Sequence, residues 1–162
     1  MIVASQLAGF VAAHAIESIA AGVRPVPMLG FTDAEGQRQL QKFAGHVGES
    51  IEHARVQLTT NAMDANDAVL LYDGRIQQGE TALRALVLEL RCYAWPGAEV
   101  VLAVPYTRTA AAASLRVHSP KLLVWSGCED FEMGAVLQAF FDGVQSHASG
   151  YAVWSAALDE SI

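Results

Sequence analysis

Three sets of residues in this chain have the types and spacing that acid–base, metal or thiol chemistry could use. In the first set, His14 and Glu17 lie three positions apart in an apolar, alanine-rich segment, so a helix would place them on one face. A histidine beside a carboxylate can serve as a general base. The same spacing is more typical of a half-buried histidine that a carboxylate satisfies, and we expect that structural role.

The second set has the composition of a metal site and consists of His46, Glu49, Glu52 and His53. On a helix these side chains point about 145° away from the apolar stripe, at about 100° per residue, and are therefore solvated. His46 and His53 are separated by a rise of about 10.5 Å, which is too far for both to bind one ion. We expect no metal and no cofactor in this protein.

The third set pairs a thiol with an imidazole, Cys92 with His118. Cys92 falls on the strand face predicted to meet the core, where a thiol is normally inert. Neither Cys92 nor Cys128 belongs to a CxxC motif, so we expect two reduced thiols in a cytoplasmic protein. His147 extends an apolar helical stripe near a helix C-terminus, where the helix dipole favours a protonated imidazole. The chain has no GxSxG, P-loop, GxGxxG or HExxH motif, which disfavours common hydrolases, NTPases and dehydrogenases.

A run of strands must position these side chains. The segment Leu83 to Trp95, the turn signal Pro96-Gly97 and the segment Glu99 to Tyr106 predict an antiparallel hairpin. A two-residue turn would set Tyr93 opposite Val100. The predicted core face then carries Leu88, Leu90, Cys92, Val101, Ala103 and Pro105.

The other face of this hairpin carries Glu89, Arg91, Tyr93 and Trp95, a mixture of charges and aromatic rings that is typical of interface anchors. Three interpretations stay open: a half-exposed surface with a weak ion pair, a dimer or partner interface, and a ligand pocket. The acids Glu129, Asp130 and Glu132 are further interface candidates, although they also suit a helix N-terminus. A pocket between helices and sheet would use His14, Glu17, Tyr72 or His118.

The remaining pattern predicts a single α+β domain over residues 1–162, in the order αβα-ββββ-αα, with helices packed on one face of an antiparallel sheet of about five strands. We expect helices over residues 3–21, 37–60, 126–147 (opened by a Ser126–Glu129 capping box) and 151–158. We expect strands over residues 26–32, 68–72, 75–77, 83–95, 99–106 and 114–125, the last broken at Ser119-Pro120. Turns are expected at 33–36 and at Asp73-Gly74, and a loop at 107–113.

Composition restricts the classes of partner. The 162 residues are 52% hydrophobic and carry a net charge of −7, which disfavours nucleic-acid binding and favours a homo-oligomer or a basic protein partner. The charge is uneven, because residues 81–125 are mostly basic and residues 126–162 carry no Lys or Arg. The apolar N-terminal segment lacks a positive flank and is interrupted by His14 and Glu17, so we expect a core helix and no membrane contact.

These observations favour a small, acidic, non-enzymatic protein-interaction protein of bacterial type. It would act in the cytoplasm either as a homodimer or on a basic partner, as an immunity or inhibitor-like protein does. The alternative is a small-ligand-binding protein or small enzyme with a pocket between sheet and helices. No family resemblance supports either interpretation.

Overall fold

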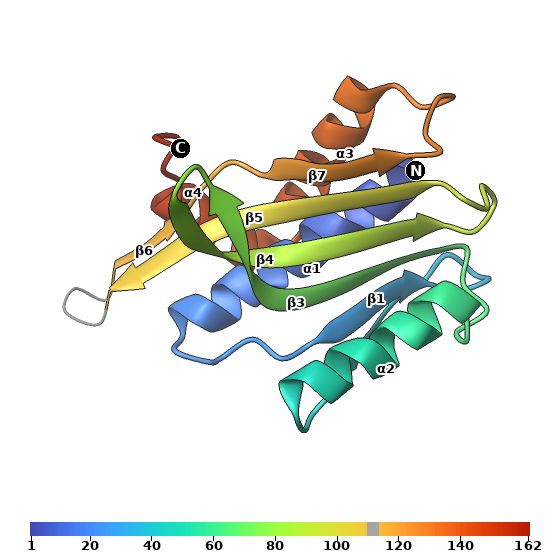
Figure 1. The fold of residues 1–162 in the computed structure, drawn as a ribbon, viewed down its shortest axis with the longest axis horizontal. Coiled ribbons are helices and arrows are strands. Elements are labelled where there is room, and N and C mark those ends of the chain that lie inside the picture. Colours follow the sequence, from blue (N-terminus) through green and yellow to red (C-terminus); the bar gives the residue numbers. More distant parts are fainter. Residues whose placement is uncertain (110–113) are drawn as a thin grey trace.

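The protein has four helices and a seven-stranded antiparallel sheet, and the computed structural model describes residues 1–109 and 114–162 (Figure 1). The helices are α1 (Ile2–Ala20), α2 (Val47–Thr60), α3 (Met133–Ser146) and α4 (Ala148–Ala157). The strands are β1 (Met28–Thr32), β2 (Arg38–Lys42), β3 (Asp67–Gln78), β4 (Thr81–Cys92), β5 (Glu99–Thr109), β6 (Ser114–Val117) and β7 (Lys121–Ser126). The predicted α+β class is confirmed.

The sheet has the strand order β2-β1-β3-β4-β5-β6, and β7 also pairs with β5. Alternate residues of β3 face different layers, as strand geometry requires. Val69 and Leu71 face the larger core with α1, α3 and α4, whereas Ala68 and Leu70 face a second core with α2. Three helices therefore cover one face of the sheet and α2 covers part of the other (Figure 1), which differs from the expected placement of all helices on one face.

Helix α1 packs against α3 and α4 at backbone distance. A Cβ added at Gly9 would overlap the carbonyl oxygen of Phe140, and one added at Gly143 would overlap that of Gln6. At the start of this contact the buried Ser5 hydroxyl donates a hydrogen bond of 2.6 Å to the carbonyl oxygen of Val136. The alanine-rich composition of α1 is therefore a packing requirement, because small residues let helix backbones approach closely.

The predicted helix over residues 37–60 is wrong in its first part. Arg38–Lys42 forms β2, which pairs with β1 across a turn that the Asp33 carboxylate closes by accepting hydrogen bonds from the amides of Glu35 and Gln37. The chain reaches α2 only after Gly45, whose φ of 120° is incompatible with a helix. In this strand the side chain of Leu40 is exposed.

Two predicted turns are also wrong. Asp73-Gly74 lies inside β3, where Asp73 forms an ion pair with Arg84 of β4, and the hairpin turns at Gly79-Glu80 instead. The β4–β5 connection is not a two-residue turn but two successive turns, closed by the amides of Trp95 and Ala98. Val100 consequently pairs with Leu90 rather than Tyr93, a shift of three residues that turns the other face of β5 toward the core.

The N-terminal helix, the 33–36 turn and the break at Ser119-Pro120 agree with the prediction. The Ser126–Glu129 capping box does not form, because α3 begins later: Glu132 is its N-cap and accepts hydrogen bonds from the amides of Gly134 and Ala135. Of the predicted 107–113 loop, residues 107–109 belong to β5 and residues 110–113 lie outside the described part of the chain.

We expect Gly143→Ala to destabilise the protein by about 1–3 kcal/mol or more, because the new methyl group meets the backbone of α1. The matched control is Gly48→Ala in α2, where nothing lies within 4 Å of the added carbon. That change should be neutral or stabilise by up to about 1 kcal/mol through helix propensity. Urea unfolding of both variants checks this, and equal midpoints would contradict the packing account.

Candidate functional site

Glu89 lies between the sheet and α2, where it forms an ion pair with Arg55. The guanidinium donates to both carboxylate oxygens, with 2.7 Å from Nη2 to Oε1. Glu89 is only 8% exposed, and Arg55 also reaches Glu52 and lies over the ring of Tyr72. The hydrogen bond to Glu89 raises the pKa of Arg55 above its ordinary value. This pair fastens α2 to the sheet, so Glu89 is not available to a partner.

Tyr93 and Tyr72 belong to the same internal contact. The Tyr93 hydroxyl donates a hydrogen bond of 2.6 Å to the carbonyl oxygen of Leu58 in α2. Burial raises the pKa of Tyr93 to about 12 and also raises that of Tyr72. Two of the predicted interface candidates, Glu89 and Tyr93, therefore hold α2 in place. Tyr72 lies on this face of the sheet and not with the other pocket candidates.

We expect Arg55→Met to destabilise the protein by about 1–3 kcal/mol, because it leaves the Glu89 carboxylate buried without a cation. The double variant Arg55→Met/Glu89→Leu should recover most of that loss, since it removes the stranded charge. Urea unfolding at neutral pH measures both. A double variant no more stable than Arg55→Met would show that the loss came from packing of the arginine side chain.

At the end of the sheet near the β4–β5 turn, an exposed aromatic contact meets a group of acids. Trp95 is 47% exposed and its ring lies 5.4 Å, centroid to centroid, from that of Phe131. Glu129 and Asp130 precede Phe131 in the β7–α3 connection and are exposed. We call Trp95, Glu129, Asp130, Phe131 and Glu132 the aromatic–acidic patch. Four of its members were predicted from the sequence as interface candidates, and Phe131 was not.

Arg91 lies near this patch but is already paired within the chain. It donates to the Glu99 carboxylate at 3.1 Å and to its neighbouring carbonyl at Leu90. Arg91, Trp95 and Glu99 line a cavity of about 390 Å³ together with Cys92 and Tyr93. The weak surface ion pair that one interpretation placed between Glu89 and Arg91 does not form, because Glu89 pairs with Arg55 of α2 and Arg91 pairs with Glu99 of β5.

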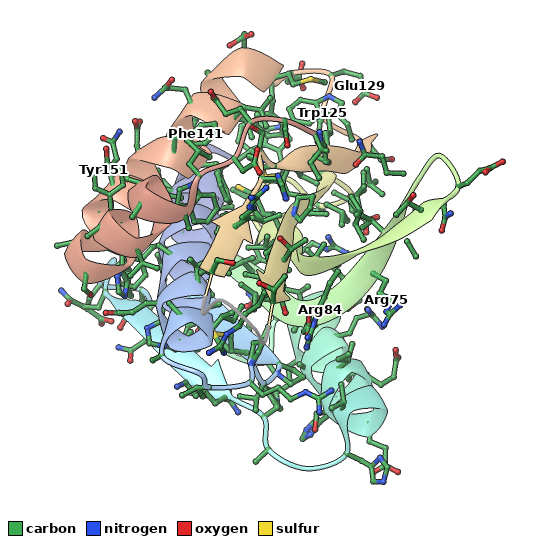
Figure 2. All side chains as sticks on the ribbon, turned by 90° about the vertical axis from the view of Figure 1, so that its left-hand side faces the viewer. Arg75, Arg84, Trp125, Glu129, Phe141 and Tyr151 are labelled. Atoms are coloured by element: carbon green, nitrogen blue, oxygen red, sulfur yellow. The ribbon has the colours of Figure 1, made fainter. Side chains whose placement is uncertain are left out.

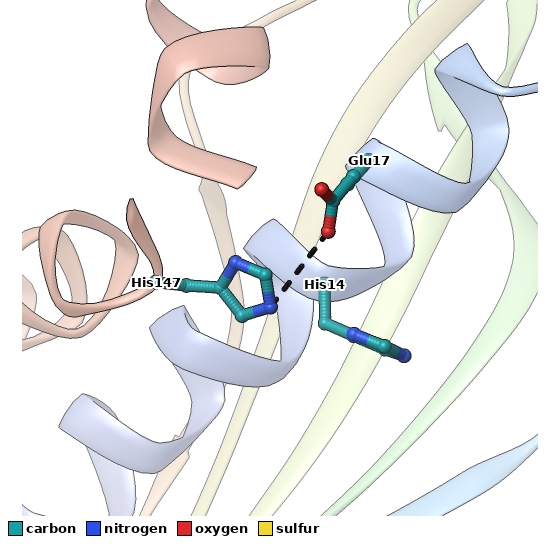
Figure 3. Close-up of side chains that lie close together, drawn as sticks. All are labelled: His14, Glu17 and His147. Carbon is teal, nitrogen blue, oxygen red and sulfur yellow. Dashed lines mark ion pairs between the residues drawn. The ribbon is translucent and has the colours of Figure 1, made fainter. Parts of the chain in front are cut away.

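Two predicted pocket candidates, His14 and Glu17, meet a third residue that the sequence had treated separately, His147 (Figure 3). Their potential ligand atoms lie within 4.8 Å of one another, and His147 Nε2 lies 3.9 Å from Glu17 Oε2. His147 joins α3 to α4, and its ring packs against Phe10. The close approach of α1 to these helices is what assembles the cluster.

The hydrogen bonding of His147 does not suit a metal ligand. Its Nδ1 accepts a hydrogen bond of 3.0 Å from the amide of Gly150 and so caps α4. A neutral imidazole that accepts at Nδ1 carries its proton on Nε2, the atom that faces Glu17. A metal at Nε2 would need a proton on Nδ1 and would break this cap. The arrangement of the cluster is therefore that of a helix cap beside a carboxylate and not that of a metal site.

His14 is the titratable member with a displaced pKa. Its Nε2 is buried and has no hydrogen-bond partner in the part of the chain that the structure describes. Burial, with smaller contributions from Lys42 and His147, lowers the pKa of His14 below 6.5 despite Glu17. The unfolded chain consequently binds the proton first as the pH falls. Stability from this residue is complete above pH 6.5 and decreases as the pH falls toward the lowered pKa.

We therefore expect His14→Gln to make thermal stability less dependent on pH between 7.5 and 5. Thermal unfolding across this range should show a smaller fall for the variant than for the wild type. His46→Gln, a change at an exposed position, is the control and should follow the wild-type curve. A variant curve parallel to the wild type would contradict the assignment to His14.

His118 and Cys92 do not form a thiol–imidazole pair. His118 is buried, and its Nδ1 contacts the carbonyl oxygen of Asp159 at 2.8 Å, tying down the C-terminal segment. The amide of His118 donates a hydrogen bond to the carbonyl oxygen of Pro105. Cys92 lies at the other end of the sheet, opposite Asp67. Along β5 this separation is about 20 Å. Burial raises the pKa of the Cys128 thiol, which makes that cysteine a poor nucleophile.

Helix α1 is long and apolar enough to cross a membrane on length and composition alone. In this fold most of the helix is buried against the sheet, α3 and α4, as a core helix would be. Arg55 is a further residue that the sequence patterns did not single out. The signal for it is Glu89, an acid flanked by Leu88 and Leu90 in β4, which needs a cation nearby if it is buried.

Searches with this chain found no matching protein-family model, curated protein or solved structure.

Proposed function

We propose that this protein is a non-enzymatic interaction domain that binds a basic partner protein through the aromatic–acidic patch. The observation that carries the proposal is the contact between Trp95 and Phe131, two aromatic residues from separate loops that meet at the surface beside exposed carboxylates. Tryptophan is among the residues most enriched in interface hot spots.

The patch has a fixed geometry. The backbones of the two loops lie so close that a Cβ at Gly127 would overlap the carbonyl oxygen of Gly97. Glu132 holds the start of α3 through two backbone hydrogen bonds. A surface that is already ordered loses little conformational entropy when a partner binds.

The charge of the patch favours a basic partner. Within the described ranges, Glu129 and Asp130 form no ion pair, so their exposed carboxylates are available to cations, whereas the Glu132 carboxylate adds negative charge while it caps α3. Complementary charge steers association and selects against acidic proteins. The protein would thereby neutralise a basic toxin or enzyme, as immunity and inhibitor proteins do. Cytoplasmic action is part of the proposal, and two free thiols accord with a reducing compartment.

Trp95 is a sharper probe of this surface than Arg91. Replacing Arg91 with glutamate would set two carboxylates against each other at Glu99, so a loss of binding could arise from local distortion. Trp95 projects from a loop and is nearly half exposed, so its truncation should leave the core unchanged.

The test immobilises the wild-type chain and the variant Trp95→Ala/Glu129→Gln/Asp130→Asn and recovers bound proteins from the lysate of the source organism. A captured protein is then purified and its Kd measured. We expect a basic protein whose Kd weakens at least ~30-fold in the variant, since loss of a hot spot costs about 2 kcal/mol or more. The wild-type Kd should also weaken as salt increases.

The control carries equivalent changes elsewhere: Tyr151→Ala on the outer side of α4, with Glu35→Gln and Glu160→Gln (Figure 2). It should bind like the wild type. Retention of the partner by the patch variant would contradict the proposal. So would recovery of only this chain, which would indicate self-association in its place.

A further inference from the structure

A second surface of this protein has the opposite charge. Two adjoining cavities, of about 290 and 280 Å³, lie where the end of α1 meets the β3–β4 hairpin and β5. They share Arg24 and Arg84; the first cavity adds Arg108 and the second adds Arg75. Figure 2 shows Arg75 and Arg84 side by side, well away from Glu129. We call these four residues the arginine cluster.

The arginine cluster has more positive charge than the chain itself neutralises. Its four cations meet one acid, Asp73, which leaves a local charge of +3 in a protein whose net charge is −7. Asp73 is fully occupied by Arg84, which bonds both carboxylate oxygens, and by the hydroxyl of Tyr106 at 2.8 Å. Within the described ranges, Arg24, Arg75 and Arg108 have no ion-pair partner.

The backbone brings these like charges together. Arg75 and Arg84 are direct cross-strand neighbours, an arrangement that destabilises a sheet when both residues carry the same charge. Gly22, with a φ of 87°, turns the chain at the end of α1 and lies against the Arg108 guanidinium. The helix dipole of α1 favours cations at this end, but it does not account for the pair on the hairpin.

The cavity also offers a floor and a fixed donor. Ile19 and the ring of Tyr106 are buried beneath the arginines, and the Arg84 guanidinium lies 5.5 Å from the centre of that ring. Asp73 fixes the orientation of Arg84, and the pairing raises its pKa, so it stays charged. A guanidinium group can donate two parallel hydrogen bonds to the oxygens of one phosphate. The volume of the first cavity, about 290 Å³, suits a small molecule rather than a large cofactor.

We propose that the arginine cluster binds a small phosphorylated molecule, with its dianionic phosphate between Arg24, Arg84 and Arg108 and its apolar part against Ile19. This site is separate from the aromatic–acidic patch and does not depend on the function proposed for it. The probe is inorganic phosphate, because every phosphorylated molecule carries this group. Citrate tests whether a carboxylate anion binds equally well.

The test measures thermal unfolding and calorimetric binding with phosphate, citrate and chloride at equal ionic strength. We expect phosphate to stabilise the wild type more than the other two anions do. Arg24→Gln/Arg108→Gln should bind phosphate at least about tenfold more weakly, because two charged hydrogen-bond donors are lost. Without phosphate, this variant should be at least as stable as the wild type, since two repelling charges are gone.

The matched control is Arg38→Gln/Lys42→Gln, which removes two exposed cations from β2 and should respond to phosphate like the wild type. Three outcomes would overturn the proposal: phosphate that stabilises no more than chloride, a stronger response to citrate, or an unchanged phosphate affinity in Arg24→Gln/Arg108→Gln. If Arg24→Gln/Arg108→Gln is less stable than the wild type without phosphate but binds phosphate equally well, the two arginines only stabilise the end of α1.

Discussion

The architecture depends on how closely α1 approaches α3 and α4. Gly9 and Gly143 face each other's helices at backbone distance, and the buried Ser5–Val136 hydrogen bond fixes the register between α1 and α3. Interiors packed this tightly adjust poorly to added volume. The same contact brings His147 to Glu17 and sets the start of α3 beside the β7 loop. Small residues where α1 packs against α3 thus position polar groups at both ends of α3.

The sequence was a good guide where a pattern is local and long. The apolar periodicity of α1 and the apolar runs of β4 and β5 are each decided by their own residues, and the structure has all three elements. Residues 38–42 were misassigned because β2 is exposed and is stabilised by pairing with β1, which no local period reveals. The face of β5 was misassigned because register follows turn length, and the turn contained more residues than its Pro-Gly signal indicated.

In the candidate sites, too, residue type could be predicted from the sequence, but contacts between distant segments could not. Trp95, Glu129 and Asp130 could be selected by residue type, but their meeting with Phe131 depends on two loops touching across the sheet. Glu89 and Tyr93 had the chemistry of an interface and were used inside the protein, beneath a helix that the sequence had placed on the other face. The uneven charge along the chain carried over into space only in part, because Arg24 and Arg75 join the arginine cluster from outside residues 81–125. Arg116 of that basic segment pairs with Asp159 of the acidic one. The aromatic–acidic patch and the arginine cluster nevertheless occupy separate surfaces (Figure 2). Separate acidic and basic surfaces give the molecule an electric dipole, which orients charged partners before contact.

The short outer strands have a consequence for the way in which other chains can attach. β2 is five residues long, bears Arg38 and Lys42 at its two ends and exposes every side chain. At the opposite margin, the end of β6 is covered by the C-terminal segment: Leu158 forms a bridge with Val117, and the Asp159 amide donates a hydrogen bond to the Val117 carbonyl oxygen. Charged, short or covered margins resist the strand-to-strand addition that leads to swapped dimers and fibrils. At the β2 and β6 margins, contact with another chain is thereby directed to side chains rather than to the addition of a strand.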